Sequence, residues 1–164
     1  MILPLSPKDL KVVLRYLGFV WIIFSSVFLL PVIVALCFKE YGAILDFLIG
    51  FLCTLNVGLL LILLFPQKRE LNWAQGILLV GLLWLGSMFF SAIPLYLSGH
   101  YQGYLDACFE SMSGLATTGL TLVKDLEGLS LSMNFFRHLL MFVGGQGIVI
   151  VALSLLFKPG LSSI

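Results

Sequence analysis

The segment from Phe109 to Val123, FESMSGLATTGLTLV, gathers hydroxyl side chains and glycines inside a chain that is otherwise strongly apolar. Its middle part lacks the pattern of a helix, and Gly119 can adopt positive φ or extended conformations that other residues resist. An extended strand with such a glycine can turn several consecutive carbonyls the same way, and threonine hydroxyls add further oxygens. At membrane depth, such a row of oxygens can hold a dehydrated monovalent cation. The candidate ion-binding residues are therefore Thr117, Thr118, Gly119, Leu120 and Thr121.

A second interpretation of this segment is purely structural. A short helix and loop can dip into a membrane only to fill a gap between other helices. Irregular backbone at that depth must be covered by protein or reached by water, because each unpaired N–H or C=O in lipid costs several kcal/mol. The partly negative C-terminal end of a short helix would favour a cation at the loop. On the shape of the motif alone, both interpretations stay open.

Composition places the chain in a membrane. Of its 164 residues, 60% are hydrophobic and only 10% are charged, whereas soluble domains carry about a quarter charged residues. We therefore expect a polytopic membrane protein, and the net charge of +1 argues against nucleic acid as a partner. The three cysteines Cys37, Cys53 and Cys108 lie in apolar runs, so their spacing predicts neither a disulfide framework nor a metal site.

Four segments are long and apolar enough to cross a bilayer, which needs roughly 20 residues. They are Val12–Phe38, with a kink expected at Pro31, and Ile44–Phe65, Trp73–Leu97 and Asn134–Phe157. A fifth segment, Tyr104–Thr117, would be only about 20 Å long as a helix and contains several polar residues. We expect it to be re-entrant, so the order is three spans, a half-span and a span.

The positions of Lys and Arg predict the topology. With this order of spans, three basic clusters fall on one side, which we expect to be cytoplasmic: Lys8, Lys11 and Arg15; Lys68 and Arg69; and Lys158. The opposite side receives a nearly balanced set: Lys39, Glu40, Lys124, Asp125 and Glu127. The half-span then enters from the outside and returns to the outside.

Two charged residues and a glycine cluster are further candidates. Glu110 is expected to be a structural acceptor for loop N–H groups or for Arg137, rather than a cation attractor. Arg137 is expected to anchor its helix by reaching the interface. The glycines Gly144, Gly145 and Gly147 either allow close helix packing or let the helix unwind locally as a gate.

Two motifs carry a resemblance to a known family. FESMSGLATTGLT, followed by RHLLMFVGGQGIVIVALSLL, is similar to the first pore unit of the TrkH/KtrB-type potassium transporters of the Trk/Ktr/HKT superfamily. The matching positions are Phe109, Glu110, Ser113, Gly114, Thr117, Thr118, Gly119, Arg137, Gly144, Gly145, Gly147 and Ile148. The chain departs from the family pattern at Ala116, where a threonine is common, and at Gln146, where an apolar residue is usual.

The resemblance implies an all-α membrane protein with a two-helix N-terminal region, residues 1–70, and a helix–re-entrant pore helix–filter loop–helix unit, residues 71–164. It implies potassium uptake across a bacterial inner membrane, with K⁺ held at Thr117, Thr118 and Gly119 in one quarter of a selectivity filter. The expected partners are lipid, the remaining pore units or further copies, and a cytosolic nucleotide-binding regulator of the TrkA/KtrA kind.

Two other functions compete with transport. The alternative is a truncated, non-transporting membrane subunit or scaffold that packs against a partner transporter. An intramembrane enzyme is disfavoured, since no nucleophile has a nearby base and no metal-ligand cluster is present in the sequence. We expect no organic cofactor. The sequence does not settle coupling to H⁺ or Na⁺, or K⁺ against Na⁺.

Overall fold

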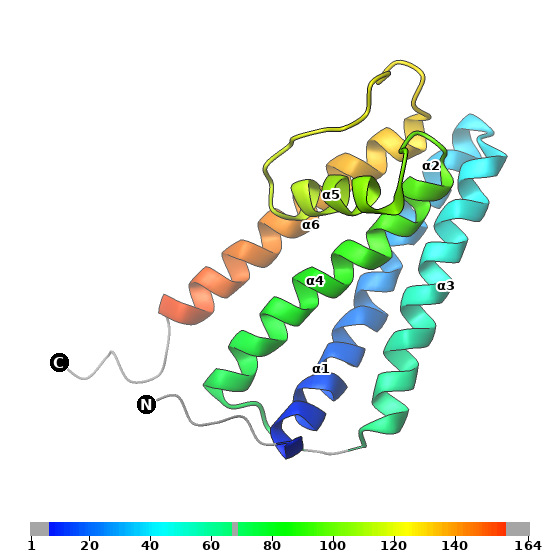
Figure 1. Ribbon diagram of the computed structural model, residues 1–164. Helices are drawn as coiled ribbons and strands as arrows, with labels where there is room; N and C mark the ends of the chain where they lie inside the picture. The colour runs from blue at the N-terminus through cyan, green and yellow to red at the C-terminus, as the bar shows by residue number, and fades with distance from the viewer. Residues whose placement is uncertain (1–6, 67–68, 157–164) are drawn as a thin grey trace.

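Helices make up all the regular structure in the part of the chain that the computed structural model describes, residues 7–66 and 69–156 (Figure 1). The expected all-α class is therefore confirmed. The elements are α1 (Pro7–Ser25), η1 (Ser26–Phe28), α2 (Leu29–Phe38), α3 (Tyr41–Leu64), α4 (Trp73–Leu97), α5 (Tyr104–Leu115) and α6 (Leu131–Leu156).

Four stretches of helix within these residues are long and apolar enough to cross a membrane. They are Asp9–Phe38, Tyr41–Leu64, Trp73–Leu97 and Leu131–Leu153, which confirms the four expected spans. The last helix begins at Leu131, earlier than the expected Asn134. The expected end of that span at Phe157 lies outside the described residues.

The first span is interrupted near the expected kink. Between α1 and α2 the chain makes one 3₁₀ turn, Ser26–Phe28. Pro31 has no N–H, and its ring conflicts with the carbonyl of Val27 four residues earlier. Because that α-helical hydrogen bond cannot form, the irregular turn lies just before the proline rather than at it.

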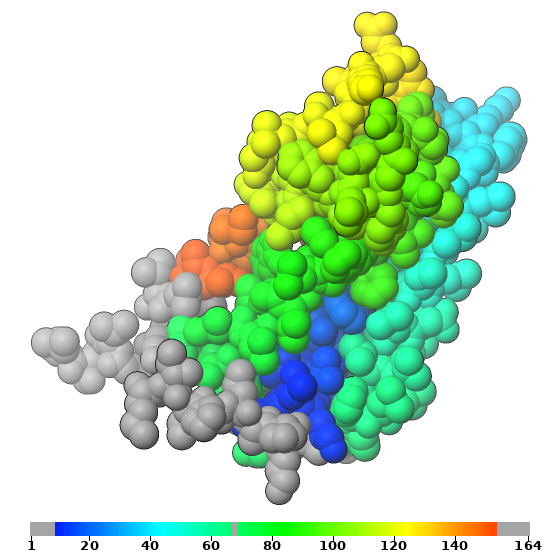
Figure 2. Space-filling view, viewed as in Figure 1, coloured from blue at the N-terminus to red at the C-terminus, as the bar shows by residue number. Residues whose placement is uncertain are grey.

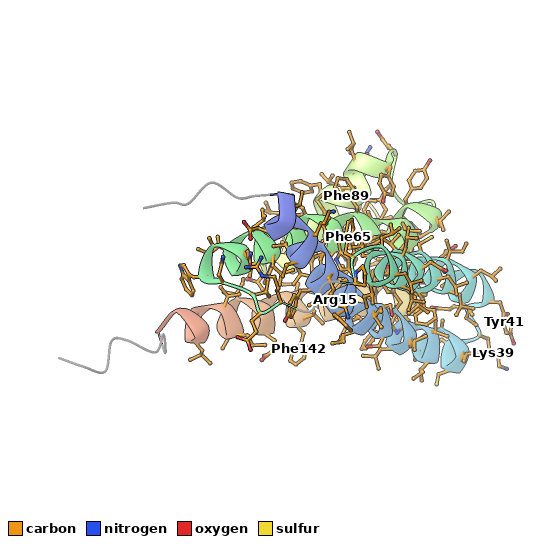
Figure 3. The ribbon with its side chains drawn as sticks, turned by 90° about the horizontal axis from the view of Figure 1, so that it is seen from below. Arg15, Lys39, Tyr41, Phe65, Phe89 and Phe142 are labelled. Carbon is orange, nitrogen blue, oxygen red and sulfur yellow. The ribbon has the colours of Figure 1, made fainter. Side chains whose placement is uncertain are left out.

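Among the described basic residues, Lys11, Arg15 and Arg69 lie toward one end of the bundle, and Lys39, Lys124 and Arg137 lie toward the other. The start of α1, the end of α3 and the start of α4 lie at the lower end in Figure 1, while α6 runs down from the upper end and stops higher than they do. The Arg15 guanidinium there donates to the carbonyls of Ile62 and Phe65 at 3.4 and 3.2 Å, where the end of the α3 dipole favours a cation (Figure 3). Lys68, Lys158 and the side chain of Lys8 lie outside the described residues. That this end is cytoplasmic stays a prediction.

An aromatic cluster at the other end joins the N-terminal helices to α6. Phe28, Phe47 and Phe136 are fully buried, and the Phe136 ring lies 5.5 Å from the Phe28 ring and 5.2 Å from the Phe47 ring, between centroids. These residues come from η1, α3 and α6. In addition, α1 and α3 pack against α4. The two expected regions, 1–70 and 71–164, thus share one core.

Helix α5 packs against α4 and α6 near the upper end of the molecule and does not run the length of the bundle (Figure 1). It begins with the Gly103 N–H donating to Asp106 Oδ2 at 3.1 Å, and it has 12 residues. At about 1.5 Å per residue it is too short to span a bilayer. The segment between α5 and α6 covers this end of the molecule in Figure 2. That α5 is re-entrant stays a prediction.

The aromatic cluster generates a stability prediction. Phe136→Ala removes a fully buried ring that contacts two others, so we expect the free energy of unfolding in detergent to fall by about 3–5 kcal/mol. The neighbouring Phe135 is 39% exposed, and Phe135→Ala serves as the matched control with a much smaller expected loss. Equal losses in thermal unfolding of the two variants would contradict this core.

Candidate ion-binding loop

Helix α5 ends in a backbone conformation that suits glycine, yet the residue there is a threonine. Thr117 has φ 57°, and its N–H donates to the Gly114 carbonyl at 2.8 Å. The N–H of Thr118 reaches back to the Ser113 carbonyl at 2.9 Å. This pair of bonds is the Schellman ending of a helix, which usually takes glycine at the left-handed position. A β-branched residue there is strained by about 1–3 kcal/mol, so the surrounding contacts must hold it.

These hydrogen bonds decide where the next carbonyls point. All peptide bonds in the described residues are trans, so each C=O points opposite to the N–H of the residue that follows it. Because the N–H groups of Thr117 and Thr118 point back to α5, the carbonyls of Ala116 and Thr117 point away from that helix. The Gly119 N–H also lies toward Ser113, at 3.4 Å, which turns the Thr118 carbonyl outward in the same way.

The second half of the loop is held from behind by two side chains of α5. The Ser113 hydroxyl donates to the Leu120 carbonyl at 2.7 Å, so this carbonyl is directed at the helix instead of away from it. The Leu122 N–H donates to Glu110 Oε2 at 2.9 Å, which turns the Thr121 carbonyl outward. Gly119, with φ 75°, provides the change of direction between the two halves.

An ion pair under the loop fixes Glu110. Arg137 Nε and Nη2 both lie 2.7 Å from Glu110 Oε1, while Oε2 accepts the Leu122 N–H. The side chains are 3% exposed for Glu110 and 16% for Arg137. Arg137 also donates to Asn134 Oδ1 at 3.3 Å. The Arg137 guanidinium pairs with Glu110 because a buried carboxylate needs a cation and hydrogen-bond donors. That Arg137 also anchors its helix at the interface stays a prediction.

The charges of Glu110 and Arg137 also affect the pKa of Tyr101, in the segment between α4 and α5. Tyr101 there is 6% exposed. Burial and then the negative charge of Glu110 raise the pKa of its hydroxyl above the ordinary value, while Arg137 opposes the shift. The phenol thus stays neutral, and the net charges close beneath the loop are those of Glu110 and Arg137.

Two glycines of α6 allow close packing, Gly144 against the end of α5 and Gly147 against Trp84 of α4. A Cβ on Gly144 would overlap the backbone carbonyl of Leu115, and one on Gly147 would lie 2.8 Å from the Trp84 ring. A Cβ on Gly145 would meet only the Thr117 methyl, at an ordinary 3.5 Å. Helix α6 is continuous through all three glycines. The structure therefore contains the close packing, and local unwinding as a gate stays a prediction.

A pocket of about 430 Å³ lies between the loop and α6. Gly119, Leu120 and Thr121 line one side of it, and Arg137, His138 and Met141 line another. The His138 Nδ1 is 2.8 Å from the Asn134 carbonyl, and its ring is exposed. Within residues 7–66 and 69–156, no group of three or more His, Cys, Asp or Glu could hold a metal ion. That the loop beside this pocket binds an ion stays a prediction.

The sequence interpretation left three of these supports unassigned. Ser113 was noted only as one of the polar residues of the short segment and as a match to the family pattern, although its hydroxyl holds Leu120. The Trp84 indole N–H lies 3.4 Å from the Leu115 carbonyl, at the end of α5. Glu40 accepts hydrogen bonds from the start of α6. A polar residue in an apolar helix was the available signal for Ser113, while the other two contacts depend on tertiary packing.

The ion pair generates a prediction about Glu110. Glu110→Gln leaves the Arg137 charge without its partner, so we expect a loss of about 3–5 kcal/mol in folding stability and a poor yield of assembled protein. The double variant Glu110→Gln, Arg137→Gln removes both charges and should recover part of that stability in thermal unfolding. Normal folding of Glu110→Gln together with an altered K⁺/Na⁺ preference would contradict the structural role.

The close approach of α6 to α5 at Gly144 generates a second prediction, about folding stability. Gly144→Ala must push α6 away from the end of α5, so we expect a loss of about 1–3 kcal/mol in unfolding measurements. Gly145→Ala is the matched control, because its added methyl makes an ordinary contact and alanine favours the helix. If the two variants unfold alike, the packing described at Gly144 is incorrect.

Comparison with known proteins finds relatives over nearly the whole chain. The family model described as "TrkH: Cation transport protein" matches residues 43–163. An uncharacterized cation transporter of Methanocaldococcus jannaschii is 36% identical over 156 residues, which are 95% of this chain and 32% of the relative. The Trk system potassium uptake protein TrkH of Escherichia coli is 36% identical over 152 residues, 89% of this chain and 30% of the relative.

A solved structure has the same arrangement of helices. The crystal structure of the potassium transporter TrkH from Vibrio parahaemolyticus matches with a TM-score of 0.80 and 32% identity, over 90% of this chain and 32% of that one. The chain thus spans about a third of the length of the relatives it matches. With four spans and this family model, it is a multi-pass protein of an inner membrane. The chain belongs to the TrkH family of cation transport proteins.

Proposed function

We propose that this chain is part of the membrane subunit of a Trk-type potassium uptake system and supplies one quarter of its selectivity filter. The names of its relatives favour K⁺ as the transported ion: the E. coli relative is called a potassium uptake protein, and the Vibrio parahaemolyticus structure a potassium transporter. The observation that carries the proposal is the direction of the carbonyls that follow α5, because a filter must present oxygens where a bare ion can reach them.

The proposed ligands are the backbone oxygens of Thr117, Thr118 and Gly119, with Thr121 beyond them. The loop residues 116–122 are exposed, although α5 beneath them is largely buried. The N–H groups of 117–119 point back toward α5, so that no row of donors competes with a cation. Leu120 belongs to the proposed loop, but its carbonyl accepts from Ser113 and contributes support in place of coordination.

The charges under the loop fit a supporting role. Both oxygens of Glu110 accept hydrogen bonds, one from Arg137 and one from the Leu122 N–H, and the side chain is nearly fully buried. A carboxylate placed in this way fixes the loop and does not compete for the ion. Potassium would then be held by neutral dipoles, from which it can also leave.

One such loop cannot enclose an ion. The remaining three sides would come from further pore units, for which the relatives have room because this chain spans about a third of them. A cytosolic nucleotide-binding regulator would bind at the end that carries Lys11, Arg15 and Arg69. A non-transporting scaffold is the alternative, and uptake by the transporter that contains this chain, in cells lacking other potassium uptake, separates the two.

The filter assignment predicts the effect of Gly119→Ser. A serine strains the backbone at φ 75°, so we expect the row of carbonyls to rearrange and the K⁺/Na⁺ preference of uptake to fall about tenfold or more. Gly99 has a matching φ of 76° in the turn after α4, with open space around its Cα. Gly99→Ser therefore imposes the same strain away from the loop and should keep the preference. Unchanged selectivity in Gly119→Ser would rule out the filter assignment.

A further inference from the structure

Glu40 ties the N-terminal helices to the start of α6. It lies in the turn between α2 and α3, and its two carboxylate oxygens accept the backbone N–H groups of Leu131 and Ser132 at 2.8 and 3.0 Å. The Ser132 hydroxyl donates to the same carboxylate at 2.5 Å, and Ser132 is fully buried. A negative group at this point also suits the positive end of the α6 dipole. The contact spans more than ninety positions of the chain.

The start of α6 is connected to the loop through a series of side-chain contacts. Within two turns of Ser132, the same helix presents Arg137, which holds Glu110, which in turn holds the Leu122 N–H. Phe136, next to Arg137, packs against Phe28 and Phe47 of the N-terminal helices. A shift or rotation of the first turn of α6 would therefore move the guanidinium that fixes Glu110.

We propose that Glu40 is a positioning residue for the ion-binding loop, through which the two N-terminal helices set the place of α6 and hence of the Arg137–Glu110–Leu122 support. The effect that we expect on K⁺ uptake rests on the proposed function. The structural part of the inference, the link from Glu40 to the loop, can be tested without transport.

The titration of Glu40 agrees with this role. Burial raises the pKa of the Glu40 carboxyl, whereas the hydrogen bonds from Ser132 and Leu131 lower it. Together the hydrogen bonds outweigh burial, so the pKa lies below the ordinary value. A group with a lowered pKa in the folded state adds stability above its unfolded pKa and loses that contribution as the pH falls through the folded pKa. The link is therefore fully formed near neutral pH and weakens only in acid.

The test uses the whole transporter that contains this chain, with the variants Glu40→Gln and Ser132→Ala, alone and combined. Glu127→Gln is the control, since it removes the same charge from an exposed residue in the segment between α5 and α6. The first measurement is amide hydrogen exchange of the peptide covering residues 116–123. We expect about fivefold faster exchange in Glu40→Gln, the size of a lost helix cap, and no change in the control. The combined variant should add little to either single change.

The second measurement is K⁺ uptake at equal surface amounts of protein. We expect a K⁺ half-saturation concentration raised about fivefold in Glu40→Gln, whereas a residue needed only for folding would lower the maximal rate and leave half-saturation unchanged. Unchanged exchange at residues 116–123 overturns the inference, whatever transport shows. Changed exchange in a transporter whose unmodified form takes up no K⁺ overturns the proposed function and leaves the link standing.

Discussion

The structure depends on one constraint, that the first backbone N–H groups after the end of α5, and that of Leu122, find their acceptors on α5. In the loop after α5 those acceptors lie on one side only. The carbonyls of Ser113 and Gly114 take the first N–H groups, and Glu110 takes that of Leu122. Because each peptide is planar and trans, using the donors on one side turns most of the carbonyls to the other. The oxygen row is thus a consequence of how α5 ends.

A buried carboxylate is the costly part of this arrangement. Desolvating Glu110 is unfavourable unless partners satisfy both oxygens, and Arg137 with the Leu122 N–H does so. Helix α6 also approaches α5 closely at Gly144, where a Cβ would overlap the Leu115 carbonyl. The ion pair and the glycine thus both lie at the contact between α5 and α6 that carries the loop.

Much of this organisation could be predicted from local sequence. Long apolar runs indicated the spans, and the short polar segment that became α5 could not cross a bilayer. The direction of the Leu120 carbonyl could not be predicted, since it depends on Ser113 being placed seven residues earlier by the helix ending. The contact of Glu110 with Arg137 was among the expected ones, whereas its simultaneous contact with the Leu122 N–H depends on tertiary packing.

The supports of the loop come from the chain that carries it, and this bears on how a pore could be built from such units. Ser113, Glu110 and Arg137 lie in the same helix–loop–helix segment as the residues they hold. Most contacts that hold this loop therefore come from its own helix–loop–helix segment, and the proposed link through Glu40 adds a support from the N-terminal helices. Enclosing an ion is a separate requirement, because the exposed carbonyls face away from every support found here. Under the proposed function, folding of this segment would set the geometry of the ligands, and assembly with further pore units would decide whether they meet around an ion.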